Sequence, residues 1–145
     1  MSGQQNKGGE TISEILSWLA RYKWKAIWTL SPSFPHTDAL SVITAGRRIL
    51  RLWEGHTGEA LGTLLLAEPH PGTRIWHLHG LISAPDFNVD AFHAFSSKWG
   101  QSDVRQYRPN GGYCAYIAQK LLRDGVEWDL YGKIILKEGE NAVYN

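Results

Sequence analysis

The chain has 145 residues, of which 43% are hydrophobic and 20% are charged. This length suits one domain, and the apolar fraction is high enough to close a core, which argues against long-range disorder. Lys and Arg number 15 against 14 Asp and Glu, for a formal charge of +1, which excludes a strongly basic wrap-around nucleic-acid binder but not a local basic groove.

Cysteine content and hydropathy exclude further classes of protein. The single cysteine, Cys114, excludes a disulfide scaffold and a zinc finger built on cysteines. No apolar run approaches the ~18 residues of a membrane span, and residues 1–10 lack the apolar centre of a signal peptide. We therefore expect a cytoplasmic protein without a membrane partner.

Residues 1–10 are polar and rich in glycine, so we expect a flexible arm followed by a single domain over 11–145. A capping box at Thr11 and Glu14 opens the first predicted helix, and Gly55 is expected to end the second. Helical spacing of apolar residues predicts helices over about 11–21, 37–53, 88–99 and 113–123. Alternation and turn residues predict strands at 24–31, 61–68, 75–82 and 102–107, and further strands near 126–131 and 133–136.

After the first helix, the predicted elements follow the order βαββαβα. Helices interleaved with hairpin-connected strands favour an α+β sandwich of ferredoxin-like type, in which helices flank a central antiparallel sheet.

His77 and His79 give the clearest chemical signal. Side chains two apart on a strand point to the same face, about 6.6 Å apart at their Cα atoms from the ~3.3 Å rise, so both imidazoles can reach one metal ion. The alternative is a pair of histidines on a half-exposed strand without a ligand. His70 is a weaker candidate for the same metal shell.

Glu68 ends the strand that precedes the histidines along the chain. A two-residue turn in the 69–74 segment places Glu68 opposite His77, and a slip of two residues keeps it on the histidine face. One carboxylate and two imidazoles suit Mg²⁺ or Mn²⁺ with positions left for water and phosphate oxygens, and they would also hold Zn²⁺. The alternative is a solvated strand end.

The fourth predicted helix places a phenol, an ammonium and a guanidinium on one stripe, from Tyr116, Lys120 and Arg123, with Tyr113 beside them. Such a stripe can supply a nucleophile together with charge that binds phosphate. An ordinary amphipathic helix, with half-buried tyrosines and solvated cations, is the alternative.

Several of these segments, in order, resemble HUH endonucleases, the rolling-circle replication initiators and their relatives. Residues 76–82, Trp-His-Leu-His-Gly-Leu-Ile, are similar to the His-hydrophobic-His motif of that family. Residues 28–31 resemble its first-strand motif, and Glu68 stands where many members supply a third metal ligand. Residues 115–120, Ala-Tyr-Ile-Ala-Gln-Lys, resemble the helix that carries the catalytic tyrosine. The resemblance covers most of residues 24–125.

The tyrosine motif departs from the family pattern. Members often carry Tyr-x-x-Lys, whereas Gln119 stands three residues after Tyr116 and the lysine follows at 120. Tyr113 has Tyr116 at its third position instead. We favour Tyr116 as the nucleophile, and the choice between it and Tyr113 stays open.

The resemblance implies a metal-dependent, sequence-specific endonuclease and strand transferase (Rep) acting on single-stranded DNA. Its tyrosine would attack the phosphodiester to give a 5′-phosphotyrosine and a free 3′-OH, and Lys120 would stabilise the charged transition state or activate the phenol. The expected metal is Mg²⁺ or Mn²⁺, held by Glu68, His77 and His79. The substrate would be origin DNA, as a hairpin, of a plasmid or virus that replicates by the rolling-circle route.

The expected DNA contacts are basic residues, although each of them also suits an ordinary solvated surface charge. They are Lys23, Lys25, Arg47, Arg74, Arg105, Arg108 and Arg123. The chain carries no P-loop motif, so a host helicase and polymerase are expected partners.

Three other functions stay open from the sequence alone. A relaxase and an HUH tyrosine transposase share the expected chemistry. A non-catalytic module that binds single-stranded nucleic acid would need no metal and would form no covalent adduct.

Overall fold

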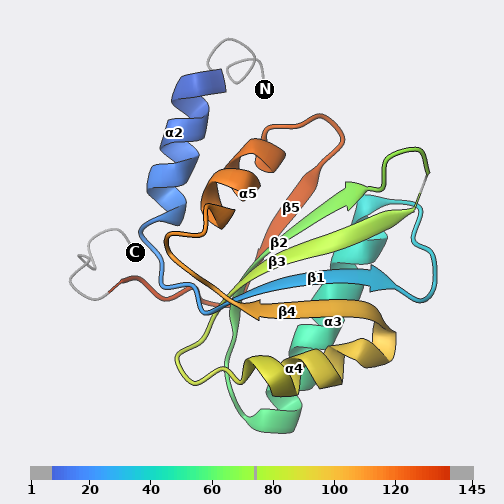
Figure 1. Cartoon of the computed structure of the whole chain (residues 1–145). Helices are drawn as coiled ribbons and strands as arrows, with labels where there is room; N and C mark the ends of the chain where they lie inside the picture. The colour runs from blue at the N-terminus through green and yellow to red at the C-terminus, as the bar shows by residue number, and fades with distance from the viewer. Residues whose placement is uncertain (1–7, 74, 138–145) are drawn as a thin grey trace.

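The computed structural model describes residues 8–73 and 75–137, in which five antiparallel strands form one sheet in the order β4-β1-β3-β2-β5 (Figure 1). The strands are β1 (Ala26–Pro32), β2 (Gly62–Pro69), β3 (Trp76–Ser83), β4 (Gly100–Gln106) and β5 (Glu127–Tyr131). The helices are α2 (Gly8–Leu19), α3 (Ala39–Thr57), α4 (Val89–Ser96) and α5 (Tyr113–Leu121), with a short 3₁₀ turn η1 (Ser97–Trp99). The predicted α+β class, with helices flanking an antiparallel sheet, is confirmed.

Side chains alternate across the sheet and bury two apolar cores. On one face Trp28, Leu78 and Phe92 belong to the core beneath α3 and α4. On the other face Leu64 and Leu81 belong to a second core beneath α5 and α2. Because side chains two residues apart share a face of a strand, even-numbered positions of β2 and odd-numbered positions of β3 lie on the α5 face.

The first helix and the last predicted strand differ from the prediction. Helix α2 begins at Gly8, so Thr11 lies inside the helix rather than at its cap, and only residues 1–7 of the expected arm fall outside the described residues. The predicted strand at 133–136 is wrong, since this segment makes one isolated bridge, from Leu136 to Tyr22. The Ile135 N–H donates to the Ser83 hydroxyl at 3.0 Å. It therefore cannot donate to a backbone carbonyl of a neighbouring strand.

Helix α3 begins where the sequence predicts and ends later. Asp38 caps it by accepting from the Ser41 N–H at 2.7 Å. The prediction that Gly55 ends the helix is wrong, because the helix continues to Thr57 and closes at Gly58, whose φ of 76° is left-handed. The Gly58 N–H donates to the Glu54 carbonyl at 2.7 Å, which satisfies a carbonyl at the helix end.

Replacing Gly55 with alanine is expected to stabilise the fold. A Cβ at this helical position meets nothing within 4 Å, and alanine in a helix interior is more favourable than glycine by roughly 0.5–1 kcal/mol. Urea unfolding of Gly55→Ala should show that gain. Gly58→Ala is the control, and it should lose stability because the left-handed backbone at Gly58 disfavours a side chain. A loss in Gly55→Ala would contradict the helical assignment.

Candidate metal and tyrosine site

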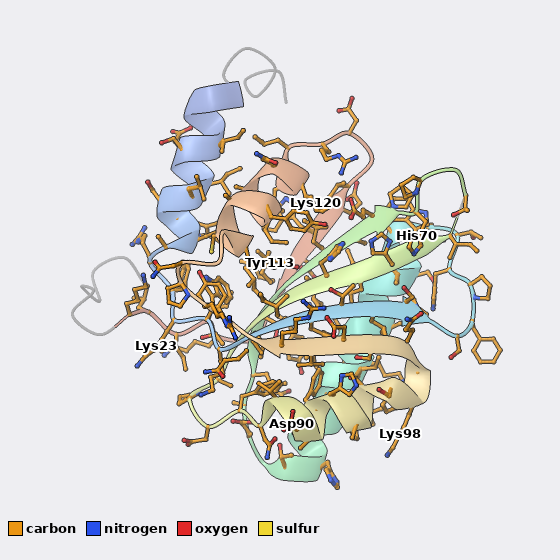
Figure 2. The ribbon with its side chains drawn as sticks, in the orientation of Figure 1. Lys23, His70, Asp90, Lys98, Tyr113 and Lys120 are labelled. Carbon is orange, nitrogen blue, oxygen red and sulfur yellow. The ribbon has the colours of Figure 1, made fainter. Side chains whose placement is uncertain are left out.

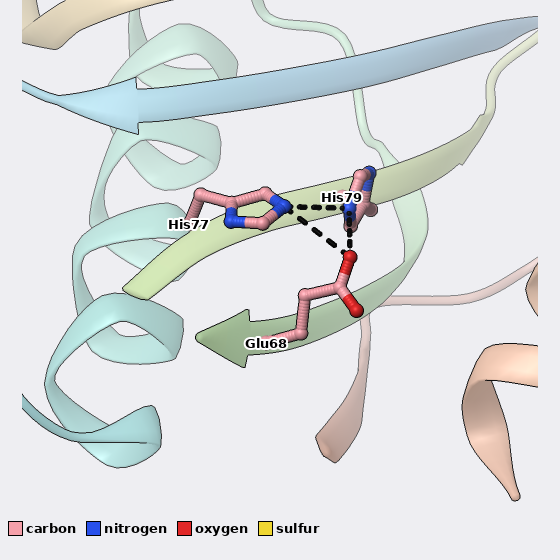
Figure 3. Close-up of side chains that lie close together, drawn as sticks. All are labelled: Glu68, His77 and His79. Atoms are coloured by element: carbon pink, nitrogen blue, oxygen red, sulfur yellow. Dashed lines mark hydrogen bonds and ion pairs between the residues drawn. The ribbon is translucent and has the colours of Figure 1, made fainter. Parts of the chain in front are cut away.

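Glu68, His77 and His79 meet on the α5 face of the sheet, near the turn that joins β2 to β3 (Figure 3). The register pairs Glu68 directly with His77, as the sequence predicts, and Leu66 with His79. All three side chains are buried. The two-residue periodicity of β3 brings both imidazoles to the same face, and the antiparallel ladder brings the carboxylate to them.

The ligand atoms are spaced as they would be around a single ion. His79 Nε2 lies 2.9 Å from Glu68 Oε1 and 3.0 Å from His77 Nε2, and His77 Nε2 lies 3.3 Å from the same carboxylate oxygen. Two ligands at ~2.1 Å from an octahedral ion, at right angles to each other, are roughly 3 Å apart. The donor set of two imidazole nitrogens and one carboxylate oxygen also suits a divalent metal. This buried group can therefore hold a metal ion.

Burial and hydrogen bonds together set the protonation states at this site. Burial, with the neighbouring imidazoles of His79 and His70, lowers the pKa of His77 to about 4. Burial also lowers the pKa of His79, although Glu68 opposes the shift. Burial by itself would raise the pKa of Glu68, but hydrogen bonds from Lys120 and His79 outweigh it and lower that pKa. Near pH 7 the imidazoles are thus neutral and the carboxylate is charged, which are the forms that bind a metal ion.

The lowered pKa of His77 predicts that the free energy of unfolding falls as the pH drops from about 6.5 towards about 4. Over that range the unfolded chain binds a proton at this histidine that the folded chain does not, so stability is full above the range and is lost below it. Urea melts of the metal-free protein at several pH values measure the slope. His77→Gln should show a shallower fall, and an equal slope in both proteins would contradict the prediction.

Helix α5 places its tyrosines and its lysine above the metal ligands. Lys120 is buried, and its Nζ donates to Glu68 Oε1 at 2.6 Å. The Tyr116 ring is 44% exposed and lies edge-on to the His79 ring, with centroids 6.1 Å apart. The ammonium of Lys120 also lies 4.6 Å from the centre of the Tyr116 ring. Figure 2 shows Lys120 and Tyr113 on this helix, on the same side of the sheet.

The two candidate nucleophiles differ in their surroundings. The Tyr113 hydroxyl is buried without a hydrogen-bond partner among the described residues, and burial raises the pKa of that phenol. Tyr116 is exposed and lies nearer the metal ligands. A buried, unpartnered phenol is harder to ionise and harder for a phosphodiester to reach, so the geometry favours Tyr116.

A groove of about 450 Å³ opens beside this site, and both His79 and Tyr116 line it. Thr29 and Asp103 contribute to its floor, because the sheet register places Thr29 between His79 and Asp103. Neither residue is among the predicted site residues. The alternation of side chains along β1 could have identified Thr29, because it places Thr29 on the face opposite Trp28.

The predicted basic residues divide between this site and other surfaces. Arg105 lines the groove and pairs with Asp103 at 2.7 Å. Arg123 reaches Glu68, with Nη1 3.5 Å from Oε2. Arg47 lies on α3, on the opposite face of the sheet, where it pairs with Asp129 at 2.8 Å.

Three further basic residues, Lys23, Lys25 and Arg108, are not brought to the candidate metal ligands. Lys25 lies just before β1, where its N–H donates to the Ile82 carbonyl, at the far end of β3 from His77. Lys23 precedes it, and the exposed Arg108 lies between β4 and α5. Arg74 lies outside the described residues. His70, the weaker metal candidate, lies beside His77, with ring centroids 4.1 Å apart and the rings tilted by 34°.

No family model, no curated protein and no solved structure matches this chain. Within residues 8–73 and 75–137, none of the helices has the length and apolar character needed to cross a bilayer.

Proposed function

We propose that this chain is a metal-dependent endonuclease and strand transferase that cuts single-stranded DNA through a covalent phosphotyrosine. The observation that carries the proposal is that candidate metal ligands, a tyrosine and a lysine lie together on one face of the sheet, where His79 and Tyr116 line a groove. A ligand triad with spacings of 2.9 to 3.3 Å lies beneath an exposed tyrosine and beside a buried lysine. The resemblance of the same residues to the HUH motifs supports this assignment.

In the proposed reaction the Tyr116 oxygen attacks phosphorus, and the bond from phosphorus to the 3′ oxygen breaks. The phenol loses its proton and the departing 3′ oxygen gains one, so the products are a 5′-phosphotyrosine and a free 3′-OH. Glu68, His77 and His79 would hold a divalent ion, Mg²⁺ or Mn²⁺ in the cell and Zn²⁺ in vitro, and that ion would supply Lewis acidity for phosphodiester chemistry. Lys120 stabilises the negative charge that develops near the phenol.

Two basic residues near the site would hold the substrate. Arg105 lines the groove and Arg123 lies beside Glu68, and we expect both to contact phosphates that flank the scissile one. The reverse attack of a 3′-OH on the phosphotyrosine rejoins the strand, which is what an initiator of rolling-circle replication requires. A host helicase and polymerase would then act on the nicked origin hairpin.

A pool of single-stranded oligonucleotides with random sequence tests the proposal without knowledge of the target. The protein is incubated with Mn²⁺ and with pools labelled at either the 3′ or the 5′ end, and the products are separated in SDS. We expect an SDS-resistant adduct that carries the 3′ label, and a shorter free fragment that carries the 5′ label.

Metal chelation and His79→Ala should both remove the adduct, because each removes the proposed metal. The absence of an adduct at any Mn²⁺ concentration would overturn the proposal. Binding of the pool that weakens with salt, without an adduct, would identify a non-catalytic module instead. Sequencing the captured fragments gives the target, which separates a replication origin from the transfer origin of a relaxase or the end of a transposon.

A further inference from the structure

Lys120 occupies the carboxylate oxygen of Glu68 that a bound metal ion would also need. Its Nζ is 2.6 Å from Glu68 Oε1, and this oxygen is also the atom that His79 and His77 approach, at 2.9 and 3.3 Å. A metal ion held by the three ligands would share that oxygen with the ammonium. Lys120 is 8% exposed, so little water is available to separate the two charges.

Positive charges already outnumber the single negative charge of Glu68 before a metal ion binds. The carboxylate contributes one negative charge, while Lys120 and Arg123 contribute two positive charges at 2.6 and 3.5 Å from its oxygens. A divalent cation at the same oxygen would be only a few ångströms from the ammonium. Like charges repel strongly at this separation when they are buried, and salt screens such a pair only weakly.

We propose that Lys120 is an internal cation that holds Glu68 while no metal is bound and that the metal ion displaces it. The ammonium thereby lowers the affinity of the site for metal. Once displaced, it turns towards the phenol of Tyr116, because its Nζ already lies over that ring at 4.6 Å from the centre. Metal binding would in this way move the positive charge of Lys120 towards the phenol of Tyr116. This inference rests on the metal site of the proposed function, but it does not require DNA cleavage.

Titration of the metal-free protein with Mn²⁺ tests the competition. Lys120→Met keeps most of the side-chain length and removes the charge, so we expect its affinity for Mn²⁺ to rise by about tenfold or more, as relief of a close repulsion predicts. Two further variants are compared with it, one at the second cation beside Glu68 and one at a remote cation that serves as the control. Arg123→Gln should change the affinity by less than about threefold, because its guanidinium side chain is 61% exposed and therefore well screened. Lys98→Met, beyond α4 on the other face (Figure 2), should change nothing.

The thermal stability of the same variants separates competition from a purely structural role. In EDTA, Lys120→Met should melt below the wild type, because the buried Glu68 carboxylate loses its nearest cation. Saturating Mn²⁺ should then raise the melting temperature of Lys120→Met by more than it raises that of the wild type. A lysine with a structural role alone would lower both melting temperatures equally, and that result would overturn the proposal, as would an unchanged or weaker affinity for Mn²⁺.

A measurement on the wild type keeps the proposal testable if Lys120→Met does not fold. The ¹⁵Nζ resonance of a buried, hydrogen-bonded lysine can be followed by NMR during titration with Mg²⁺ or Zn²⁺. We expect the Lys120 signal to shift and its protons to exchange faster as the ring nitrogens of His77 and His79 report metal binding. An unchanged lysine signal at full metal occupancy would contradict displacement.

These measurements use no DNA, so they fail separately from the proposed function. If the affinity and NMR results agree with displacement while no phosphotyrosine forms, the metal site stands and the cleavage activity is wrong. If neither wild type nor Lys120→Met binds Mn²⁺, the displacement itself is wrong.

Discussion

Tyr116→Phe is expected to abolish the covalent adduct with single-stranded DNA, whereas Tyr113→Phe should keep most of it. Phenylalanine retains the ring that packs against His79 and removes only the oxygen that would attack phosphorus. The Tyr113 hydroxyl has no hydrogen-bond partner among the described residues and is buried, so its removal breaks no hydrogen bond within that part of the chain.

The comparison is informative because the two rings are close neighbours, with centroids 5.4 Å apart. A general disturbance of α5 would affect both variants alike. The measurement is the amount of SDS-resistant adduct formed at equal protein and Mn²⁺ concentrations, with melting curves to show that both variants fold. If Tyr113→Phe alone removes the adduct, the nucleophile assignment is wrong, and partial loss in both variants would indicate that the two phenols share the reaction.

The sequence predicts that Glu68, His77 and His79 come together because β-strand periodicity is strict. Any pairing of β2 and β3 with the correct parity places Glu68 on the same face as His77 and His79, and the observed register pairs Glu68 with His77 itself. Pro69 and Pro71 stand in the predicted turn between these strands, so the sequence alone does not fix the register. The Pro69 to Trp76 pair at the end of the ladder shows that Pro69 is accommodated within β2.

The contact between Lys120 and Glu68 could not be predicted in the same way. The stripe of Tyr116, Lys120 and Arg123 follows from helical spacing, but spacing does not fix how a helix rotates about its axis over a sheet. That rotation is set by residues such as Ile117 and Ala118, which pack into the second core. Local patterns therefore identify which side chains share a face, and tertiary packing decides which of them reaches the carboxylate.

Helix ends illustrate a similar limit. Gly55 and Gly58 both follow the last strongly apolar turn of α3, and either can end a helix by composition. In the structure the helix ends at Gly58. The carboxylate of Glu54, in the last turn of α3, accepts a hydrogen bond from the Leu61 N–H at 2.7 Å. That contact requires the chain to turn back towards β2, which no local propensity encodes.

Glu68→Met is expected to destabilise the metal-free protein by about 3–5 kcal/mol, the usual cost of removing one partner of a buried ion pair. The substitution leaves the Lys120 ammonium, 8% exposed, beside two imidazoles without an anion. Urea unfolding in EDTA measures the loss. Lys120→Met should also destabilise the protein, because it leaves the carboxylate without its nearest cation.

The double variant Glu68→Met/Lys120→Met tests whether the ion pair is needed for stability. Two apolar side chains of similar volume often replace a buried ion pair at little cost, so the double variant should recover most of the stability that Glu68→Met loses, and the cycle should give a large coupling energy. Simple additivity of the two single losses would contradict a direct interaction. If the double variant is as stable as the wild type but binds no Mn²⁺, stability alone does not account for a buried carboxylate and ammonium here. The pair would then be explained by the cation chemistry of the site, in which one positive charge holds the carboxylate until another replaces it.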